Sequence, residues 1–181
     1  MRVTVFGSAR VGEDSEEYRD ARRLGEMLAG RGDVIVSGGY GGIMEAVSRG
    51  AHEAGGQVVG VTVAPWIGRL APNRYLSEER SARTLFERLE ALIESDALIA
   101  LPGGAGTLGE VALAWNLRQM ELMAPKPVIL VGPIWQGMVD AFRRHLIVNP
   151  RDLALLTLVD TIDQAIERLD APDTASGQWY G

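Results

Sequence analysis

The sequence predicts a single α/β domain with a doubly wound parallel sheet flanked by helices. Short apolar runs rich in β-branched residues alternate with longer amphipathic segments, which is the pattern of βαβ units. Most of the short runs are apolar on both faces, as expected of strands that helices cover on both sides. The 181 residues, 46% of them hydrophobic, are enough for one core. Together these observations indicate a Rossmann-like fold.

The short apolar runs are the expected strands, and the amphipathic segments between them are the expected helices. In chain order, the strands are residues 2–6, 33–37, 57–62, 97–101, 127–131 and 154–159. The helices are residues 15–31, 42–54, 81–95, 107–123, 135–147 and 162–169. Asp14, with Glu17 three residues later, can cap the first helix, and Pro125 with Pro127 ends the fourth.

Residues 64–79 contain two prolines, a glycine and scattered arginines, and they follow neither the helical nor the strand period. We expect a long loop there, and loops of this length are often functional. Because no internal repeat or second domain is recognised, residues 1–170 are expected to form one domain. Residues 171–181 are expected to form a flexible tail.

The composition restricts the possible functions. A net charge of −6 argues against a nucleic-acid surface, which usually carries a basic excess. No apolar run approaches the ~20 residues that cross a bilayer, and no signal peptide is recognised, so we expect a cytoplasmic protein without a membrane partner. Cysteine is absent, and His52 and His145 lie far apart, so no metal site is expected. No cofactor is expected either.

Three predicted strand-to-helix turns are rich in small residues: Gly7-Ser8, residues 38–42 (GGYGG) and residues 102–107 (PGGAGT). In a parallel sheet such turns open at the same edge, and glycine lets phosphate oxygens approach backbone N–H groups. A helix beginning at Thr107 would add the positive end of its dipole. One such turn can simply be a tight connection. Three together predict a site for a nucleoside 5'-monophosphate or a similar phosphorylated nucleotide.

A nicotinamide-dependent oxidoreductase is an alternative, because residues 104–109 (GAGTLG) match the dinucleotide pattern G-x-G-x-x-G. That fingerprint requires an acidic residue about 20 positions on, at the end of the next strand. Here the strand ends in residues 130–133 (LVGP), which contain no carboxylate. The mononucleotide interpretation is therefore favoured.

Two charged groups lie near the third glycine turn. Glu110 completes a T-x-x-E capping box, which its spacing alone favours, but it can instead face the cleft and stabilise positive charge on a ribose. Most charges on the preceding helix are expected to be solvated, yet Arg83 or Arg88 could bind phosphate or a purine nitrogen there. Met44 and Trp115 follow the apolar period and are interpreted as core or cleft lining.

Residues 101–110 (LPGGAGTLGE) match the PGGxGTxxE signature of the LOG family, the cytokinin riboside 5'-monophosphate phosphoribohydrolases. Residues 37–44 (SGGYGGIM) resemble the same family's earlier GGGxxGxM stretch, and the resemblance extends from Val3 to about Ile147. It implies a Rossmann-like homodimer that hydrolyses the N-glycosidic bond of a nucleoside 5'-monophosphate. The implied products are a free base and ribose 5-phosphate.

The resemblance also implies roles for individual residues. Glu110 becomes the catalytic carboxylate, and Arg88 is the nearest match to the family's second catalytic group. The residues expected to bind the phosphate and the nucleotide are Gly7, Ser8, Gly38, Gly39, Gly41, Met44, Pro102, Gly103, Gly104, Gly106 and Thr107.

The chain departs from the plant-like pattern of this family at several positions. Arg88 lies eight rather than nine residues before Asp96, and Leu89 stands where a lysine is usual. Gly109 replaces the first glutamate of the GTLEE variant, and residues 42–45 (GIME) replace GLMG. These features resemble a divergent branch or the related molybdenum-cofactor carrier proteins. A non-catalytic nucleotide or pterin carrier is therefore the second hypothesis.

Members of the family are often labelled lysine decarboxylases. A pyridoxal phosphate enzyme needs a lysine for its Schiff base. The single lysine, Lys126, stands between two prolines at the start of a predicted strand, on the edge opposite the glycine turns. We therefore do not expect a decarboxylase. The homodimer that the resemblance implies is expected to use the helices around Arg83 and Trp115.

Overall fold

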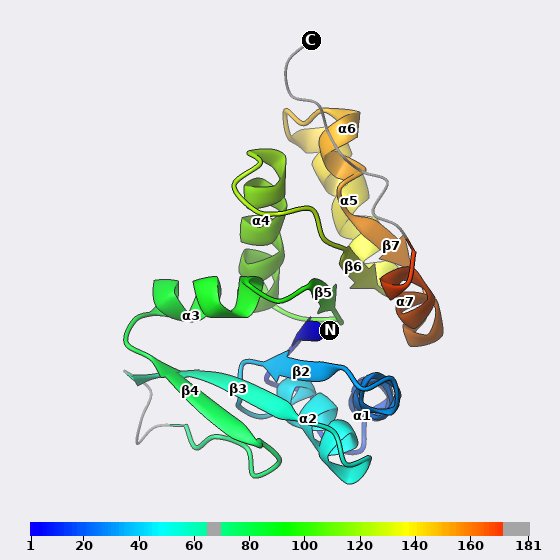
Figure 1. Cartoon of the computed structure of the whole chain (residues 1–181). Helices are drawn as coiled ribbons and strands as arrows, with labels where there is room; N and C mark the ends of the chain where they lie inside the picture. The colour runs from blue at the N-terminus through cyan, green and yellow to red at the C-terminus, as the bar shows by residue number, and fades with distance from the viewer. Residues whose placement is uncertain (65–69, 172–181) are drawn as a thin grey trace.

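The computed structural model describes residues 1–64 and 70–171 and contains one parallel sheet with helices on both sides (Figure 1). Its strands are β1 (Arg2–Phe6), β2 (Val34–Ser37), β3 (Val58–Val63), β4 (Glu78–Ala82), β5 (Ala97–Ala100), β6 (Val128–Val131) and β7 (Thr157–Val159). Every pairing is parallel, in the order β4-β3-β2-β1-β5-β6-β7. The predicted doubly wound sheet is confirmed.

The helices form a layer on each face of the sheet. They are α1 (Glu16–Gly30), α2 (Ile43–Glu53), α3 (Leu85–Ile93), α4 (Ala105–Gln119), α5 (Pro133–His145), α6 (Pro150–Leu153) and α7 (Ile162–Leu169). Helices α1, α2 and α7 share one core cluster with the strands, and α3, α4 and α5 share the other. No helix of the described residues is both long and apolar enough to span a bilayer.

The central strands supply side chains to both cores, because successive residues of a strand point to opposite faces. Val5 belongs to the cluster under α1 and α2, whereas the next residue, Phe6, belongs to the cluster under α3 and α4. Leu98 and Ile99 of β5 divide in the same way. Burial on both faces explains why these strands read as continuous apolar runs.

Strand β4 was missed by the sequence prediction. Its residues were assigned to the end of the long loop and the start of a helix at Ser81, but they pair with β3 from Glu78 to Ala82. The strand is at the sheet edge and most of it is exposed, so its sequence EERSA lacks apolar alternation. Helix α3 begins only at Leu85. Its N-cap is Thr84, whose side chain accepts a hydrogen bond from the Glu87 N–H.

Several predicted helix ends were also wrong. Ser15, rather than Asp14, caps α1 by accepting a hydrogen bond from the Tyr18 N–H. Helix α4 ends at Gln119, well before Pro125, because Glu121 adopts a left-handed conformation (φ 55°) and Leu122 N–H bonds back to the helix. Near the C-terminus, the short helix α6 precedes β7, so that strand begins at Thr157 rather than at residue 154.

Helix α4 also begins earlier than predicted. Gly104 is its N-cap and Ala105 its first residue, so Thr107 lies within the first turn. The T-x-x-E capping box is therefore not formed, and Glu110 is beyond the first turn rather than at a cap. The elements from β1 through α7 extend from Arg2 to Leu169. Most of the proposed tail, 172–181, lies outside the described residues.

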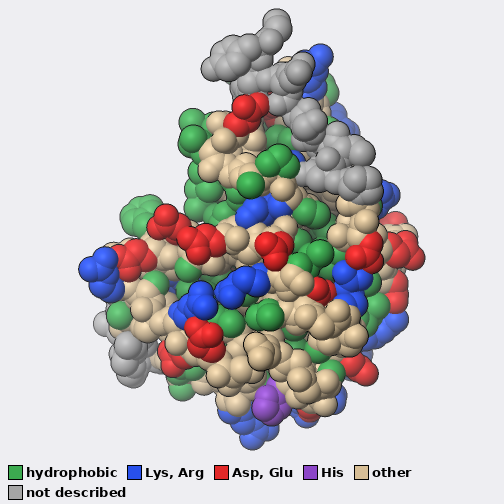
Figure 2. Space-filling view, viewed as in Figure 1, with side chains coloured by type: hydrophobic (Ala, Val, Ile, Leu, Met, Phe, Trp, Pro, Cys, Tyr) green, Lys and Arg blue, Asp and Glu red, His purple; other side chains and the backbone are tan. Residues whose placement is uncertain are grey.

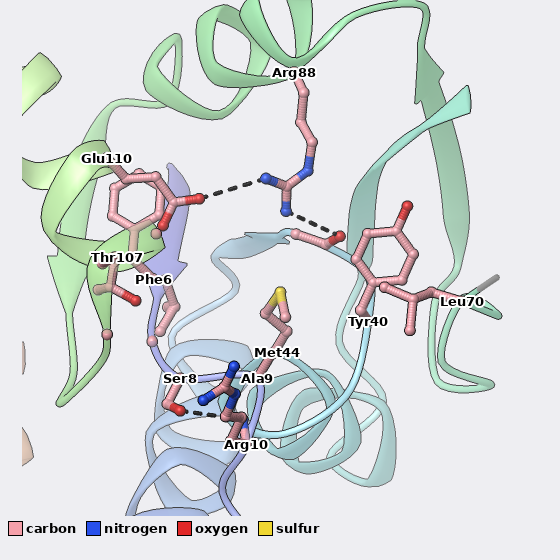
Figure 3. A pocket seen from close by; sticks show the side chains of 16 residues that line it. Phe6, Ser8, Ala9, Arg10, Tyr40, Met44, Leu70, Arg88, Thr107 and Glu110 are labelled. Carbon is pink, nitrogen blue, oxygen red and sulfur yellow. Dashed lines mark hydrogen bonds and ion pairs between the residues drawn. The ribbon is translucent and has the colours of Figure 1, made fainter. Parts of the chain in front are cut away.

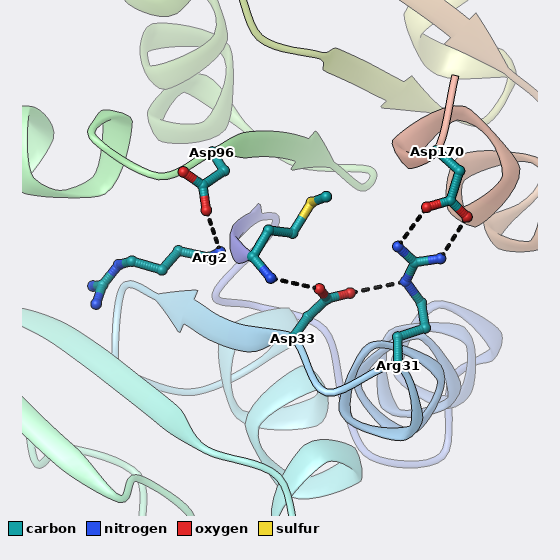
Figure 4. A network of polar contacts seen from close by, with 6 residues as sticks. Arg2, Arg31, Asp33, Asp96 and Asp170 are labelled. Atoms are coloured by element: carbon teal, nitrogen blue, oxygen red, sulfur yellow. Dashed lines mark hydrogen bonds and ion pairs between the residues drawn. The ribbon is translucent and has the colours of Figure 1, made fainter. Parts of the chain in front are cut away.

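A polar network joins the amino ends of β1 and β2 to the end of α7 (Figure 4). The buried Asp33 accepts hydrogen bonds from the Met1 ammonium at 3.0 Å and from Arg31 Nε at 2.8 Å. Arg31 also binds both carboxylate oxygens of Asp170 at 2.7 and 2.9 Å, which lowers the pKa of that carboxyl. Elsewhere, basic and acidic side chains are intermixed over the face shown in Figure 2.

We expect Arg31→Ala to lower the free energy of unfolding by about 1–3 kcal/mol, because it removes a hydrogen-bond donor from a buried carboxylate. Chemical denaturation at neutral pH measures the change. Arg22→Ala is the matched control, since Arg22 forms an exposed pair with Glu53 and should contribute little. Equal effects of the two substitutions would mean that Asp33 does not depend on Arg31.

Candidate active site

A cavity of about 470 Å³ lies beyond the carboxyl ends of the central strands. The strand order reverses between β1 and β5, and in open parallel sheets this switch point is where ligands bind. The turns that follow the two strands are joined by a hydrogen bond from Ser8 N–H to Pro102 C=O at 3.1 Å. The turn after β2 contributes the start of α2, where Ile43 N–H bonds to Ser8 C=O at 2.9 Å. The three glycine turns therefore meet at one site.

The cavity is lined by nine of the residues predicted for the site: Gly7, Ser8, Gly38, Met44, Arg88, Gly104, Gly106, Thr107 and Glu110. The other four, Gly39, Gly41, Pro102 and Gly103, are not part of the lining. Gly39 instead faces β3, and its carbonyl accepts a hydrogen bond from Asn73 N–H at 2.8 Å. A side chain on Gly103 would collide with Thr107, so Gly103 serves the packing of the turn.

Helix α4 begins at the cavity, and the N–H groups in the first turn of a helix have no partner within the helix. Its N-cap is Gly104, which has no side chain to cap the helix, and the first turn contains no acidic residue. A Cβ atom on Gly104 or Gly106 would meet no atom of the described residues within 4 Å, so the described part of the chain leaves room for a ligand beside both. The free N–H groups and the helix dipole together favour an anion at this position.

A buried ion pair lies beside the first turn of α4. Arg88 of α3 and Glu110 of α4 approach to 3.5 Å between Nη1 and Oε1, and their side chains are only 7% and 13% exposed (Figure 3). Arg88 is held further by Nε, which donates to Val61 C=O at 2.8 Å, and by Nη2, which donates to Gly38 C=O at 3.3 Å. The structure thus brings together two charged groups that are 22 positions apart in the sequence.

A family model described as "Possible lysine decarboxylase" matches residues 44–169, and one described as "SLOG cluster4 family" matches residues 1–73. The chain is 35% identical over 182 residues to the cytokinin riboside 5'-monophosphate phosphoribohydrolase LOG3 of Arabidopsis thaliana, with 93% of this chain and 81% of that protein covered. The chain belongs to the LOG family.

Two further comparisons give another relative and a solved structure with the same fold. The cytokinin riboside 5'-monophosphate phosphoribohydrolase of Mycobacterium tuberculosis is 34% identical over 155 residues, and 81% of each chain is covered. Among solved structures, the molybdenum cofactor binding protein of Rippkaea orientalis superposes with a TM-score of 0.73 at 24% identity, over 92% of this chain and 93% of that one. At this identity, the match with the Rippkaea orientalis protein shows a shared fold alone.

The description of the family model as a lysine decarboxylase does not fit the single lysine of this LOG-family chain. Lys126 Nζ donates to the carbonyls of Ile93 and Ser95 at 2.9 and 2.5 Å, at the end of α3. It therefore satisfies the carbonyl group of the last residue of α3 and one carbonyl just beyond the helix. Lys126 precedes β6 and so lies at the amino edge of the sheet, whereas the cavity lies at the carboxyl edge. It is not placed to form a Schiff base there.

Burial sets the protonation of the pair in this LOG-family site. It raises the pKa of the Glu110 carboxyl to about 7, although the Arg88 guanidinium opposes the shift. Burial also lowers the pKa of Arg88, and the Glu110 charge partly offsets that change. A carboxyl group that titrates near neutral pH is suited to exchange protons during a reaction.

Apolar side chains line the cavity on the side away from Glu110 (Figure 3). They are Tyr40, Met44 and Leu70. The Tyr40 ring is fixed at its hydroxyl, which accepts a hydrogen bond from Val63 N–H at 3.0 Å. Tyr40 and Leu70 were not predicted as site residues in this LOG-family chain. For Tyr40 a signal existed, because it lies inside the second glycine turn.

We expect Gly38→Ala to displace Arg88, because the new Cβ would overlap the Arg88 guanidinium and come within 2.5 Å of Met44 Sδ. Activity on a nucleoside monophosphate should fall at least about tenfold, as expected for loss of a positioned group. Gly137→Ala in α5 is the control, since its Cβ would meet no atom of the described residues within 4 Å. Steady-state kinetics with thermal unfolding of both variants makes the comparison, and wild-type activity in Gly38→Ala would contradict the packing argument.

Proposed function

We propose that this protein hydrolyses the N-glycosidic bond of a nucleoside 5'-monophosphate and releases a free base and ribose 5-phosphate. The observation that carries the proposal is the buried Arg88–Glu110 pair, which faces a cavity next to the open N-terminus of α4. Relatives named as phosphoribohydrolases, at 34–35% identity, support it. The proposed setting is a homodimer in the cytoplasm.

The substrate is proposed to lie along the cavity with its phosphate at the first turn of α4. The ribose then lies beside Glu110, which is one turn further along the same helix. The base extends toward Tyr40, Met44 and Leu70, whose apolar surfaces suit a flat ring. This orientation places C1' of the ribose close to the ion pair.

During the reaction the bond between C1' and the base nitrogen breaks, and positive charge develops on the ribose. The Glu110 carboxylate stabilises this charge and accepts a proton from the water whose oxygen adds to C1'. Arg88 donates hydrogen bonds to the departing base or to the phosphate. The bonding electrons leave with the base nitrogen, which takes up a proton from the solvent. Glu110 then returns the proton of the water to the solvent, so the net change is the addition of one water molecule.

The test is an assay of purified protein with AMP and other nucleoside monophosphates that follows free base and ribose 5-phosphate. Equal amounts of the two products support the hydrolase. Binding of a mononucleotide or a pterin without any base release would favour the second hypothesis, a non-catalytic carrier. The shared fold of the Rippkaea orientalis protein makes that carrier the relevant alternative.

The proposed dimer uses α3 and the neighbouring part of α4. Helix α3 exposes Phe86 and Leu85, at 81% and 49%, beside Arg83. Exposed large apolar side chains on a helix often mark a protein interface. We expect Phe86→Glu to shift the protein from dimer to monomer in light scattering after size exclusion, whereas Glu90→Gln on the same helix should not. A wild-type protein that is monomeric at high concentration would exclude the dimer.

A further inference from the structure

The charges that line the cavity do not balance. Among the described residues, the lining contains two basic side chains, Arg10 and Arg88, and one acidic side chain, Glu110. The Arg88 guanidinium is already engaged by Glu110 and by the carbonyls of Val61 and Gly38. When Glu110 is ionised, these two charges cancel. The remaining positive charge on the cavity belongs to Arg10, which was not among the predicted site residues.

Arg10 is held at the end of the cavity where the phosphate is proposed to bind. Its backbone N–H donates to the Ser8 hydroxyl at 3.1 Å, and Ser8 N–H in turn bonds to Pro102 C=O at 3.1 Å. The turn that carries Arg10 is therefore fixed against the turn that leads into α4. The Arg10 side chain lies beside Ser8 and across the cavity from Arg88 (Figure 3).

The Arg10 side chain is also available to a ligand. It is exposed, and in the described part of the chain its guanidinium forms no ion pair with a carboxylate. Many other arginines of this acidic protein are paired with acidic groups, such as Arg22 with Glu53 and Arg83 with Glu87. An arginine without such a partner, on a cavity with a net positive charge, is suited to an anion.

We propose that Arg10 is the residue by which this site distinguishes 5'-phosphorylated nucleotides from unphosphorylated nucleosides. The inference rests on the proposed function for the position of the nucleotide. The first turn of α4 contributes only the partial charge of the helix dipole, whereas a phosphate near neutral pH carries close to two negative charges. Arg10 supplies a full charge and a fork of donors from the neighbouring turn after β1. It is a substrate-binding residue, separate from the Arg88–Glu110 pair.

The experiment measures binding of ribose 5-phosphate and of ribose by calorimetry to the full chain. The variants are Arg10→Ala, Arg10→Lys and the charge-matched control Arg151→Ala, which alters an exposed arginine of α6 that is not part of the lining. We expect Arg10→Ala to weaken ribose 5-phosphate binding about tenfold or more, because a charge-assisted pair is lost. Arg10→Lys should lose less, and Arg151→Ala nothing.

Unphosphorylated ribose should bind all four proteins alike, and the ratio of AMP to adenosine turnover should fall in Arg10→Ala. Unchanged affinity for ribose 5-phosphate in Arg10→Ala would overturn the proposal. An equal loss of affinity for ribose and for ribose 5-phosphate would overturn it too, since Arg10 would then shape the cavity rather than bind the phosphate. Failure of this proposal can be distinguished from failure of the proposed function. If ribose 5-phosphate binding depends on Arg10 but no base is released, only the proposed hydrolysis is refuted.

Discussion

Glu110→Gln is expected to lower kcat for base release from AMP by about 10²–10⁴-fold, which is the usual contribution of a positioned acid–base group. The amide has almost the same size as the carboxyl group, and it can still accept a hydrogen bond from Arg88. It carries no negative charge to stabilise the ribose and takes no proton from water. The expected loss is therefore in kcat, while affinity for ribose 5-phosphate remains.

The matched control is Glu87→Gln. Glu87 lies on α3, pairs with Arg83 at the surface and does not line the cavity. It should leave both kcat and KM at their wild-type values. Full activity of Glu110→Gln, in protein that shows normal thermal unfolding, would remove Glu110 from the reaction and leave it a structural partner of Arg88.

The second large effect is a pH dependence that Glu110 introduces. If the ionised carboxylate is the active form, kcat/KM for AMP should rise about tenfold per pH unit below the pKa of about 7 and level off above it. A profile of kcat/KM against pH, compared with Glu110→Gln, isolates this group from the titration of the substrate phosphate. If kcat/KM of Glu110→Gln falls at low pH in the same way as that of wild type, the fall results from titration of the substrate phosphate.

The same titration couples to stability. The folded-state pKa of Glu110, about 7, lies above the unfolded value of about 4.3. Between these two pH values the folded protein binds more protons than the unfolded chain, so raising the pH lowers the free energy of unfolding. The slope is at most about 1.4 kcal/mol per pH unit for one group. The free energy of unfolding, measured by denaturation across this pH window, should fall by up to that slope in wild type relative to Glu110→Gln. Parallel curves for the two proteins would contradict a raised pKa of Glu110.

The fold and the general position of the site could be predicted from the sequence because both depend on local patterns. The strands buried on both faces are apolar throughout, and the three turns are rich in glycine. Once the sheet is parallel, the turns must meet at one edge. The position of Glu110 was harder to predict. Its spacing to Thr107 imitates a capping box, and only the start of α4 at Ala105 excludes that interpretation.

The contacts of Arg88 and Arg10 could not be deduced in this way. Arg88 donates hydrogen bonds to Val61 and Gly38, which belong to different strand–turn segments. The helical and strand periods of a sequence do not predict contacts between segments so far apart in the chain. Arg10 is one of seventeen arginines in an acidic chain, so its residue type carried no signal. What distinguishes it is the cavity beside it and the lack of a carboxylate partner, and both depend on the folded chain.

The polarity of β4, which concealed the strand in the sequence, has a consequence for the behaviour of the molecule in concentrated solution. An edge strand offers free N–H and C=O groups on which a strand of another molecule can pair. Here Glu78, Glu79 and Arg80 are exposed along that edge, so an incoming strand would have to desolvate or approach three charges. The opposite edge is β7, which has only three residues. Both ends of the sheet are thereby protected against edge-to-edge aggregation.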